Sequence, residues 1–140
     1  MKRLRILIIS MLGFGCLIAT GAQSSSALPY FFFQSPSHNI GCIMSKRSVR
    51  CDIRKKDWNP PPKPANCPTD WGNGVSVGKH GRAEFLCAGD TSLGAGKVLK
   101  YGFSVRYGRF RCLSKKSDMR CFNRQNGHGF KLSRQRARVF

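Results

Sequence analysis

One tripeptide in this sequence combines a titratable ring with a freely turning backbone. His128 stands between Gly127 and Gly129, and two glycines let the chain turn and leave the imidazole exposed. An exposed imidazole titrates near neutral pH, which suits acid–base catalysis. With Asp90 to orient the ring and Arg134 to hold a phosphodiester, these residues define a nuclease-like hydrolase centred on His128. The alternative is an ordinary turn in which His128 hydrogen-bonds a loop.

A second set of residues has the charge to bind anions rather than to react with them. The chain holds 25 Lys and Arg against six Asp and Glu, a formal net charge of +19. Asp118 is the only acidic residue after Asp90, and such an excess of positive charge favours salt-dependent binding of polyanions. The predicted binding residues are Arg106, Arg109, Arg111, Lys115, Lys116, Arg120, Arg124 and Arg134, followed by Lys131, Arg136 and Arg138.

The cysteines predict a disulfide framework rather than a metal site. Beyond the first 27 residues there are six of them, and an even number in a small exported domain is typical of disulfide pairing. Zinc is disfavoured because no CxxC occurs and the three His are scattered along the chain. We predict no metal and no cofactor.

Two segments of equal length predict which cysteines pair. Residues 42–51 and 112–121 each place eight residues between two cysteines, with a polar centre. If residues 46–47 and 116–117 are two-residue hairpin loops, each pair of cysteines falls at a non-hydrogen-bonded position, where a cross-strand bridge can close. Chance spacing is the alternative. The predicted pairs are Cys42–Cys51, Cys112–Cys121 and, by elimination, Cys67–Cys87.

The predicted register separates apolar from polar side chains, and a slip by one residue would mix the two faces. It also places Arg111 and Arg120 opposite the Cys112–Cys121 bridge, so a basic stripe is expected there. On the first hairpin the apolar side consists of Ile40, Cys42, Met44, Val49, Cys51 and Ile53.

Period-two alternation elsewhere predicts further strands. Residues 99–107 alternate apolar and polar side chains and change phase at 107–108, where a turn or bulge is expected. Residues 81–87 are predicted to form another strand. The only helix that we expect is a single turn at 133–136. We therefore predict an all-β domain, a small antiparallel sandwich or barrel of short strands and hairpins, stapled by three disulfides.

The first 27 residues have the organisation of a secretory signal peptide. Three basic residues precede an apolar stretch at 6–19 and a small polar run, and 14 apolar residues are fewer than the roughly 20 that span a bilayer. Cleavage is expected after Ala27 or Ala22, and retention as an anchor is the alternative. Residues 28–140 then form a single disulfide-rich β domain that is secreted or associated with the cell envelope.

Several short motifs resemble those of a secreted, mostly actinobacterial family catalogued as domain of unknown function 6636. They are NIGC at 39–42, CAGDT at 87–91 and GHGF-x-x-SR at 127–134. The sequence departs from the pattern at His38, where the family commonly has Gly after Pro-Ser, and at 136–139, which lacks an expected aromatic residue. The resemblance implies export and a cysteine framework, and it implies no activity.

Two hypotheses about the function of the protein are consistent with these features. The favoured one is a small, basic, non-enzymatic binding module, a monomer that docks to anionic envelope polymers or lipid headgroups without nucleic-acid specificity. Its support is the net charge of +16 that residues 28–140 keep, with 22 of the 25 basic residues against all six acidic ones, which exceeds what solubility requires. The alternative is the hydrolase centred on His128.

Overall fold

Short strands build two β-sheets in this chain. The computed structural model describes residues 29–140, which contain eleven strands and no helix, and so no helix able to cross a membrane. Sheet A contains β1 (Phe31–Gln34), β2 (Ile40–Met44), β3 (Ser48–Ile53), β4 (Trp71–Gly78), β5 (Glu84–Cys87) and β6 (Lys97–Val98). Sheet B contains β7 (Ser104–Tyr107), β8 (Phe110–Ser114), β9 (Met119–Asn123), β10 (Gly129–Leu132) and β11 (Ala137–Val139).

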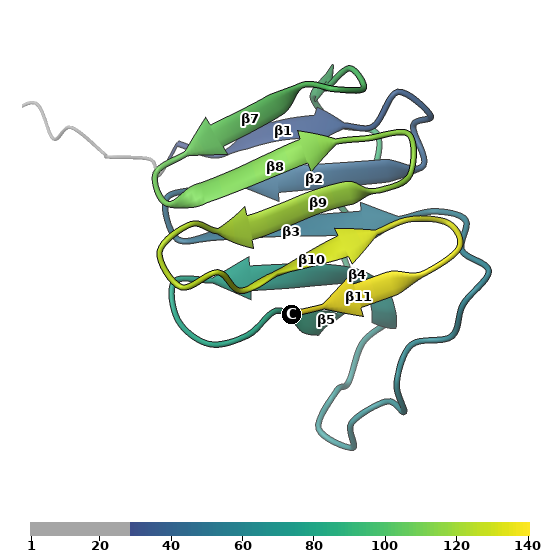
Figure 1. Cartoon of the computed structure of the whole chain (residues 1–140). Coiled ribbons are helices and arrows are strands. Elements are labelled where there is room, and N and C mark those ends of the chain that lie inside the picture. Colours follow the sequence, from purple (N-terminus) through teal and green to yellow (C-terminus); the bar gives the residue numbers. More distant parts are fainter. Residues whose placement is uncertain (1–28) are drawn as a thin grey trace, which may run out of the picture.

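The two sheets pack face to face as a β-sandwich (Figure 1). β1 to β5 follow one another as an antiparallel meander, with β6 added parallel to β1. β7 to β11 form a second antiparallel meander that lies over the first. The predicted all-β sandwich with three disulfides is confirmed.

The second and third strands of each meander form the predicted hairpins. Cys42 pairs with Cys51 and Cys112 with Cys121, each at a Cα–Cα distance of 4.1 Å. Hydrogen bonds of 2.9 Å from Ser45 N to Ser48 O and from Lys115 N to Asp118 O close the two loops. The third bridge joins Cys67 to Cys87, so the predicted pairing is confirmed.

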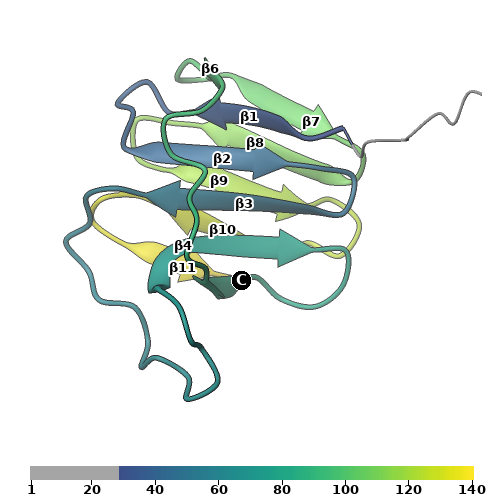
Figure 2. The same ribbon diagram turned by 180° about the vertical axis from the view of Figure 1, so that it is seen from behind.

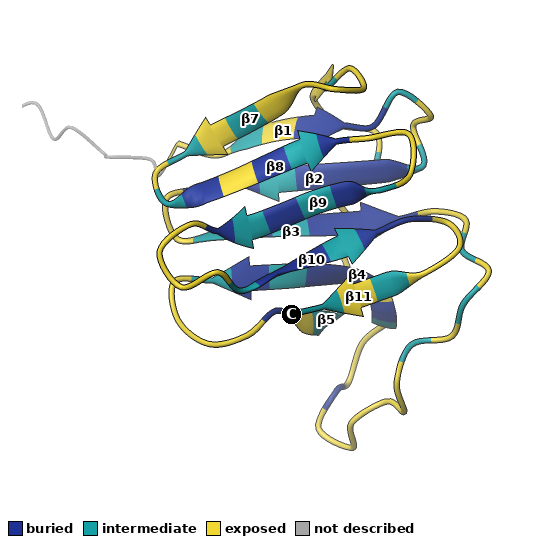
Figure 3. Cartoon of the chain, in the orientation of Figure 1, coloured by how far each residue is buried: buried dark blue, intermediate teal, exposed yellow. Residues whose placement is uncertain are grey.

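The two hairpin bridges meet in the centre of the core. The sulfurs of Cys51 and Cys121 lie 3.6 Å apart, which places one bridge against the other between the sheets. The sulfurs of Cys42, Cys51 and Cys121 lie within 4.8 Å of one another, but all three are oxidised, and metal binding requires thiolates. The same core cluster contains large buried apolar side chains from both sheets, among them Met44, Phe110, Phe130 and Leu132. Figure 3 shows buried segments along the strands of both sheets.

Two local expectations are wrong. The strand expected over 99–107 covers only β7, because Gly102 adopts a φ of +85° and Phe103 N donates to Lys100 O in a turn. Residues 133–136 form the β10–β11 hairpin loop instead of a helical turn, with Ser133 N bonded to Arg136 O. The turn expected after Tyr107 is present, with Gly108 at a φ of +56°. The predicted signal peptide, residues 1–27, lies outside the described residues.

Candidate functional site

Side chains alternate between the two faces of a strand, and this places a row of basic side chains on the outer face of sheet B. Cys112 and Cys121 point into the core, so their neighbours Arg111 and Arg120 lie on the opposite side, as the hairpin register predicted. The same side of the sheet carries further basic residues on β7, β10 and β11. We call this surface the basic face, defined by Arg106, Arg111, Arg120, Lys131 and Arg138.

The basic face places like charges directly opposite one another across the strands. Arg106 is paired with Arg111, and Lys131 lies between Arg120 on one side and Arg138 on the other. Directly opposed like charges destabilise a sheet by a few tenths of a kcal/mol to about 1 kcal/mol per pair. None of the five residues forms an ion pair with a side chain in the part of the chain described here.

Two aromatic rings hold the central cation of this face. The Arg120 guanidinium lies 5.1 Å from the Phe122 ring centroid and 5.4 Å from that of Phe140. Gly129, between these two residues on the sheet, has no room for a side chain, because a Cβ there would collide with Phe122. Arg120 Nε is buried and has no hydrogen-bond partner within residues 29–140. The two ring contacts therefore restrict the motion of the guanidinium.

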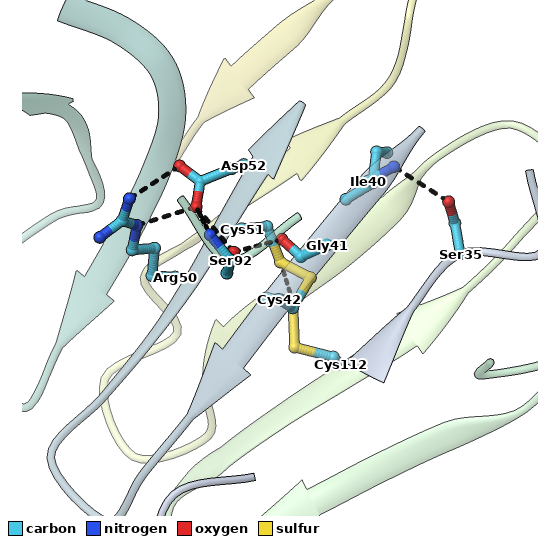
Figure 4. The surroundings of a disulfide bond; sticks show 10 residues. Ser35, Ile40, Gly41, Cys42, Arg50, Cys51, Asp52, Ser92 and Cys112 are labelled. Carbon is cyan, nitrogen blue, oxygen red and sulfur yellow. Dashed lines mark hydrogen bonds and ion pairs between the residues drawn. A yellow bond between two sulfur atoms is a disulfide. The ribbon is translucent and has the colours of Figure 1, made fainter. Parts of the chain in front are cut away.

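The outer face of sheet A differs, because the chain between β5 and β6 crosses it (Figure 2). Ser92 Oγ lies 2.7 Å from both Gly41 O and Asp52 Oδ2, two acceptors that share its single proton. Ser92 N donates to the same carboxylate at 2.8 Å. Figure 4 shows Asp52 between Ser92 and Arg50. We call residues 88–96 the covering loop. Within residues 29–140, no connecting loop crosses the outer face of sheet B (Figure 1).

An ion pair adds to the attachment of the covering loop. Arg50 Nη1 lies 2.8 Å from Asp90 Oδ1, and Arg50 Nε lies 3.0 Å from Asp52 Oδ2. Burial alone would lower the pKa of Arg50, but hydrogen bonds to Asp90 and Asp52 outweigh that effect and raise it. The same hydrogen bond and the positive charge of Arg50 hold the pKa of Asp90 below its usual range. Asp90 therefore has a structural partner.

The structure does not bring the three candidate catalytic residues together. His128 precedes β10 and Arg134 follows it, so they lie at opposite ends of that strand. Arg134 Nε pairs with Asp57 at 3.0 Å, and Asp90 pairs with Arg50 on the far side of the sandwich. His128 sits in a turn, where its N–H donates to Asn126 Oδ1 and its carbonyl accepts from Asn123 N.

The eight basic residues predicted to bind anions are distributed over three places. Arg106, Arg111 and Arg120 belong to the basic face. Arg109 and Arg124 lie in adjoining turns at one end of sheet B, joined by a 2.8 Å bond from Arg124 N to Arg109 O. At the other end Lys115, Lys116 and Arg134 line a cleft.

This cleft has a volume of about 460 Å³ and lies at one end of the sandwich. The β1–β2 turn, the segment after β3, the β8–β9 loop and the β10–β11 loop form its walls. We call it the end cleft. Besides the three basic residues just named, its lining includes His38, Arg54, Lys55, Tyr101, Ser114 and Asp118.

Sequence reasoning missed some of these residues for physical reasons. His38 stood out only as a departure from a motif, and the structure gives it a φ of +55°, a left-handed conformation that favours glycine. Ser114 was not singled out, although this polar residue interrupts the apolar inner face of β8. Phe140 joins the basic face only through the β10–β11 hairpin, which the sequence did not predict.

Residues 12–140 match the family described as Family of unknown function (DUF6636), and the chain belongs to this family. No curated protein and no solved structure matches the chain. The three disulfides indicate an oxidising environment such as the extracellular space.

Proposed function

We propose that this member of the DUF6636 family is a secreted, non-enzymatic module that binds anionic polymers of the cell envelope through the basic face of sheet B. The observation that carries the proposal is the direct opposition of like charges across β7–β8 and β9–β10–β11. Such pairs cost stability in the free protein, and a polyanion laid across the strands removes that repulsion. Solubility alone requires no such arrangement.

The spacing of the charges supports an extended ligand. Arg120, Lys131 and Arg138 lie on three neighbouring strands, about 4.8 Å apart in the direction across the sheet. The Arg120 guanidinium contacts two aromatic rings. A cation whose motion is already restricted by its neighbours loses less side-chain entropy when it binds an anion.

The apolar residues favour a polymer over a membrane surface. The exposed large apolar residues of the described chain are Tyr30, Phe32, Val98, Tyr101 and Phe103, and none belongs to the basic face. Phe122 and Phe140, which do adjoin it, lie against Arg120. The face therefore offers charge without an apolar group to insert among acyl chains.

Charge-neutralising variants test the proposal. Arg111→Gln combined with Lys131→Gln should weaken binding of fluorescent poly(glycerol phosphate) about tenfold or more at low salt, because each cation that contacts the polymer releases counterions. Lys46→Gln combined with Arg47→Gln removes the same charge from the β2–β3 loop and should change binding much less. Neutral dextran should not bind.

Equal losses in the two double variants would mean that net charge alone drives binding, and would contradict the assignment to the basic face. Tighter binding to phosphatidylglycerol vesicles than to the free polymer would show that the ligand of the basic face is a membrane surface and not a polymer.

A further inference from the structure

The end cleft lies apart from the open surface of the basic face and has the size of a small-molecule site. Its volume of about 460 Å³ falls within the range of ligand pockets, roughly 300–1,000 Å³. Five segments that are distant in sequence line it, namely residues 35–40, 54–55, 101, 114–119 and 133–135. A concave site lined from several sides can hold a ligand in one orientation.

Unpaired cations line the walls of the end cleft. Arg54 and Lys55 approach from sheet A, and Lys115 and Lys116 approach from the β8–β9 loop. None of these four forms an ion pair within residues 29–140. Cations gathered around one concavity raise the local concentration of an anion there. The end cleft is therefore suited to a negatively charged group.

A buried hydroxyl without a partner lies among the lining residues. Ser114 is 1% exposed, and its Oγ makes no hydrogen bond in the part of the chain that is described. At the opposite end of the same sheet, buried Asn123 donates to Gly78 O and Lys79 O and accepts from Gln125 N. A buried polar atom left unpaired is costly and calls for an explanation. A ligand in the end cleft would supply the missing partner.

The carboxylate of Asp118 indicates that the ligand of the end cleft is not simply a small anion. Asp118 Oδ2 accepts a hydrogen bond from Ser117 Oγ, but its Oδ1 is buried and has no partner within residues 29–140. An anion would repel this oxygen, whereas a hydroxyl would donate to it. Tyr101, 38% exposed, also lines the cleft and offers an aromatic ring, against which the apolar face of a sugar can pack.

We propose that the end cleft binds a sugar or polyol that carries a phosphate group. The phosphate lies between Lys55, Lys115 and Lys116, while the hydroxyls of the ligand pair with Asp118 and Ser114. This site is independent of the polymer contacts on the basic face, since it uses other residues and recognises hydroxyls as well as charge.

Isothermal titration of the purified protein with four small probes tests the class of ligand. Glucose 6-phosphate or glycerol 3-phosphate should bind about tenfold or more tightly than inorganic phosphate, because hydroxyls add hydrogen bonds to Asp118 and Ser114. Glucose alone should bind weakest. The proposal is overturned if inorganic phosphate binds as tightly as both phosphate esters, or if neither ester binds.

Two serine variants separate ligand binding from folding. Ser114→Ala should lower affinity for the tighter phosphate ester about three- to tenfold and leave the melting temperature unchanged or higher, because it removes an unpaired buried hydroxyl. Ser45→Ala should leave the affinity unchanged and lower the melting temperature, since Ser45 Oγ accepts from the N–H groups of Arg47 and Ser48 and closes the β2–β3 loop.

The two hairpin loops provide the matched charge test. Lys115→Gln with Lys116→Gln should weaken ester binding about tenfold, whereas Lys46→Gln with Arg47→Gln, at the equivalent loop, should leave it unchanged. Equal effects of the two loop variants, or normal affinity in Ser114→Ala, would refute the site.

Discussion

At the scale of single residues, His38 departs from the family motif and also has an unusual backbone conformation. It is the only non-glycine residue with a positive φ, +55°, among residues 29–140. Its ring Nδ1 lies 2.9 Å from Gln34 Oε1, and Gln34 Nε2 donates to Gly96 O. These contacts hold a conformation that L-residues otherwise avoid. The motif comparison identified the position, but its backbone angle depends on the whole β1–β2 turn.

A pair of variants at position 38 measures the backbone strain. His38→Gly and His38→Ala both remove the ring, so they differ in the Cβ that a positive φ penalises. We expect the glycine variant to be about 1 kcal/mol more stable than the alanine variant, after allowance for glycine's greater entropy loss on folding. Urea unfolding of both proteins gives this difference. Equal stabilities would show that the turn relaxes and stores no strain.

The ion pair between Arg50 and Asp90 predicts a dependence of stability on pH. Arg50 lowers the pKa of Asp90 in the folded protein, so the pair stabilises the fold above the unfolded pKa of about 3.9 and loses that contribution as pH falls through the folded value. Asp90→Asn should therefore lose less stability than the wild type on acidification below about pH 4. Melting temperatures measured across that range test this, and superimposable acid profiles would contradict it.

At the scale of elements, the hairpins were predictable and their surroundings were not. The equal spacing of the cysteines and the alternation of apolar and polar side chains over residues 40–53 determine the strand register within each hairpin. Residues 99–107 also alternate, but Gly102 turns the chain and Tyr101 and Phe103 stay exposed at the end of the sandwich. That outcome depends on where the neighbouring strand ends, which a single segment does not encode.

The three disulfides differ in burial, and we expect them to differ in reactivity. Cys42, Cys51, Cys112 and Cys121 are all 0% exposed, whereas Cys87 is exposed. Mild dithiothreitol under native conditions should therefore open Cys67–Cys87 first, since exchange requires access to a sulfur. Alkylation and mass spectrometry follow the order. Simultaneous reduction of all three would show that reduction requires global unfolding.

The buried carboxylate of Asp52 is one of the groups that hold the covering loop on sheet A. Asp52, 4% exposed, accepts hydrogen bonds from Arg50 and Ser92. Asp52→Asn leaves buried donors unpaired and should destabilise the protein by about 3 kcal/mol, with faster proteolysis within residues 88–96. Asp70→Asn, at an exposed carboxylate, is the control and should change unfolding by less than about 0.5 kcal/mol.

At the scale of the whole molecule, two similar meanders give two different surfaces. The covering loop crosses the outer side of sheet A, held by Ser92 and Asp52 (Figure 2). Sheet B keeps its outer side open, with the five cations of the basic face and no Asp or Glu side chain on its strands within the described chain. The basic stripe could be predicted from the hairpin register, which placed Arg111 and Arg120 outward. The like-charge rows could not, because β10 and β11 bring Lys131 and Arg138 beside them.

The salt dependence of polymer binding tests the proposed role of the basic face most directly. The dissociation constant of poly(glycerol phosphate) should rise linearly on a log–log scale as NaCl increases from about 50 mM to about 500 mM. The slope should become shallower by about 1.5 in the Arg111→Gln, Lys131→Gln variant, since two cation contacts are removed, and stay unchanged in the Lys46→Gln, Arg47→Gln control. Binding that persists unchanged in half-molar salt, or one slope shared by all three proteins, would contradict polyanion binding by this face.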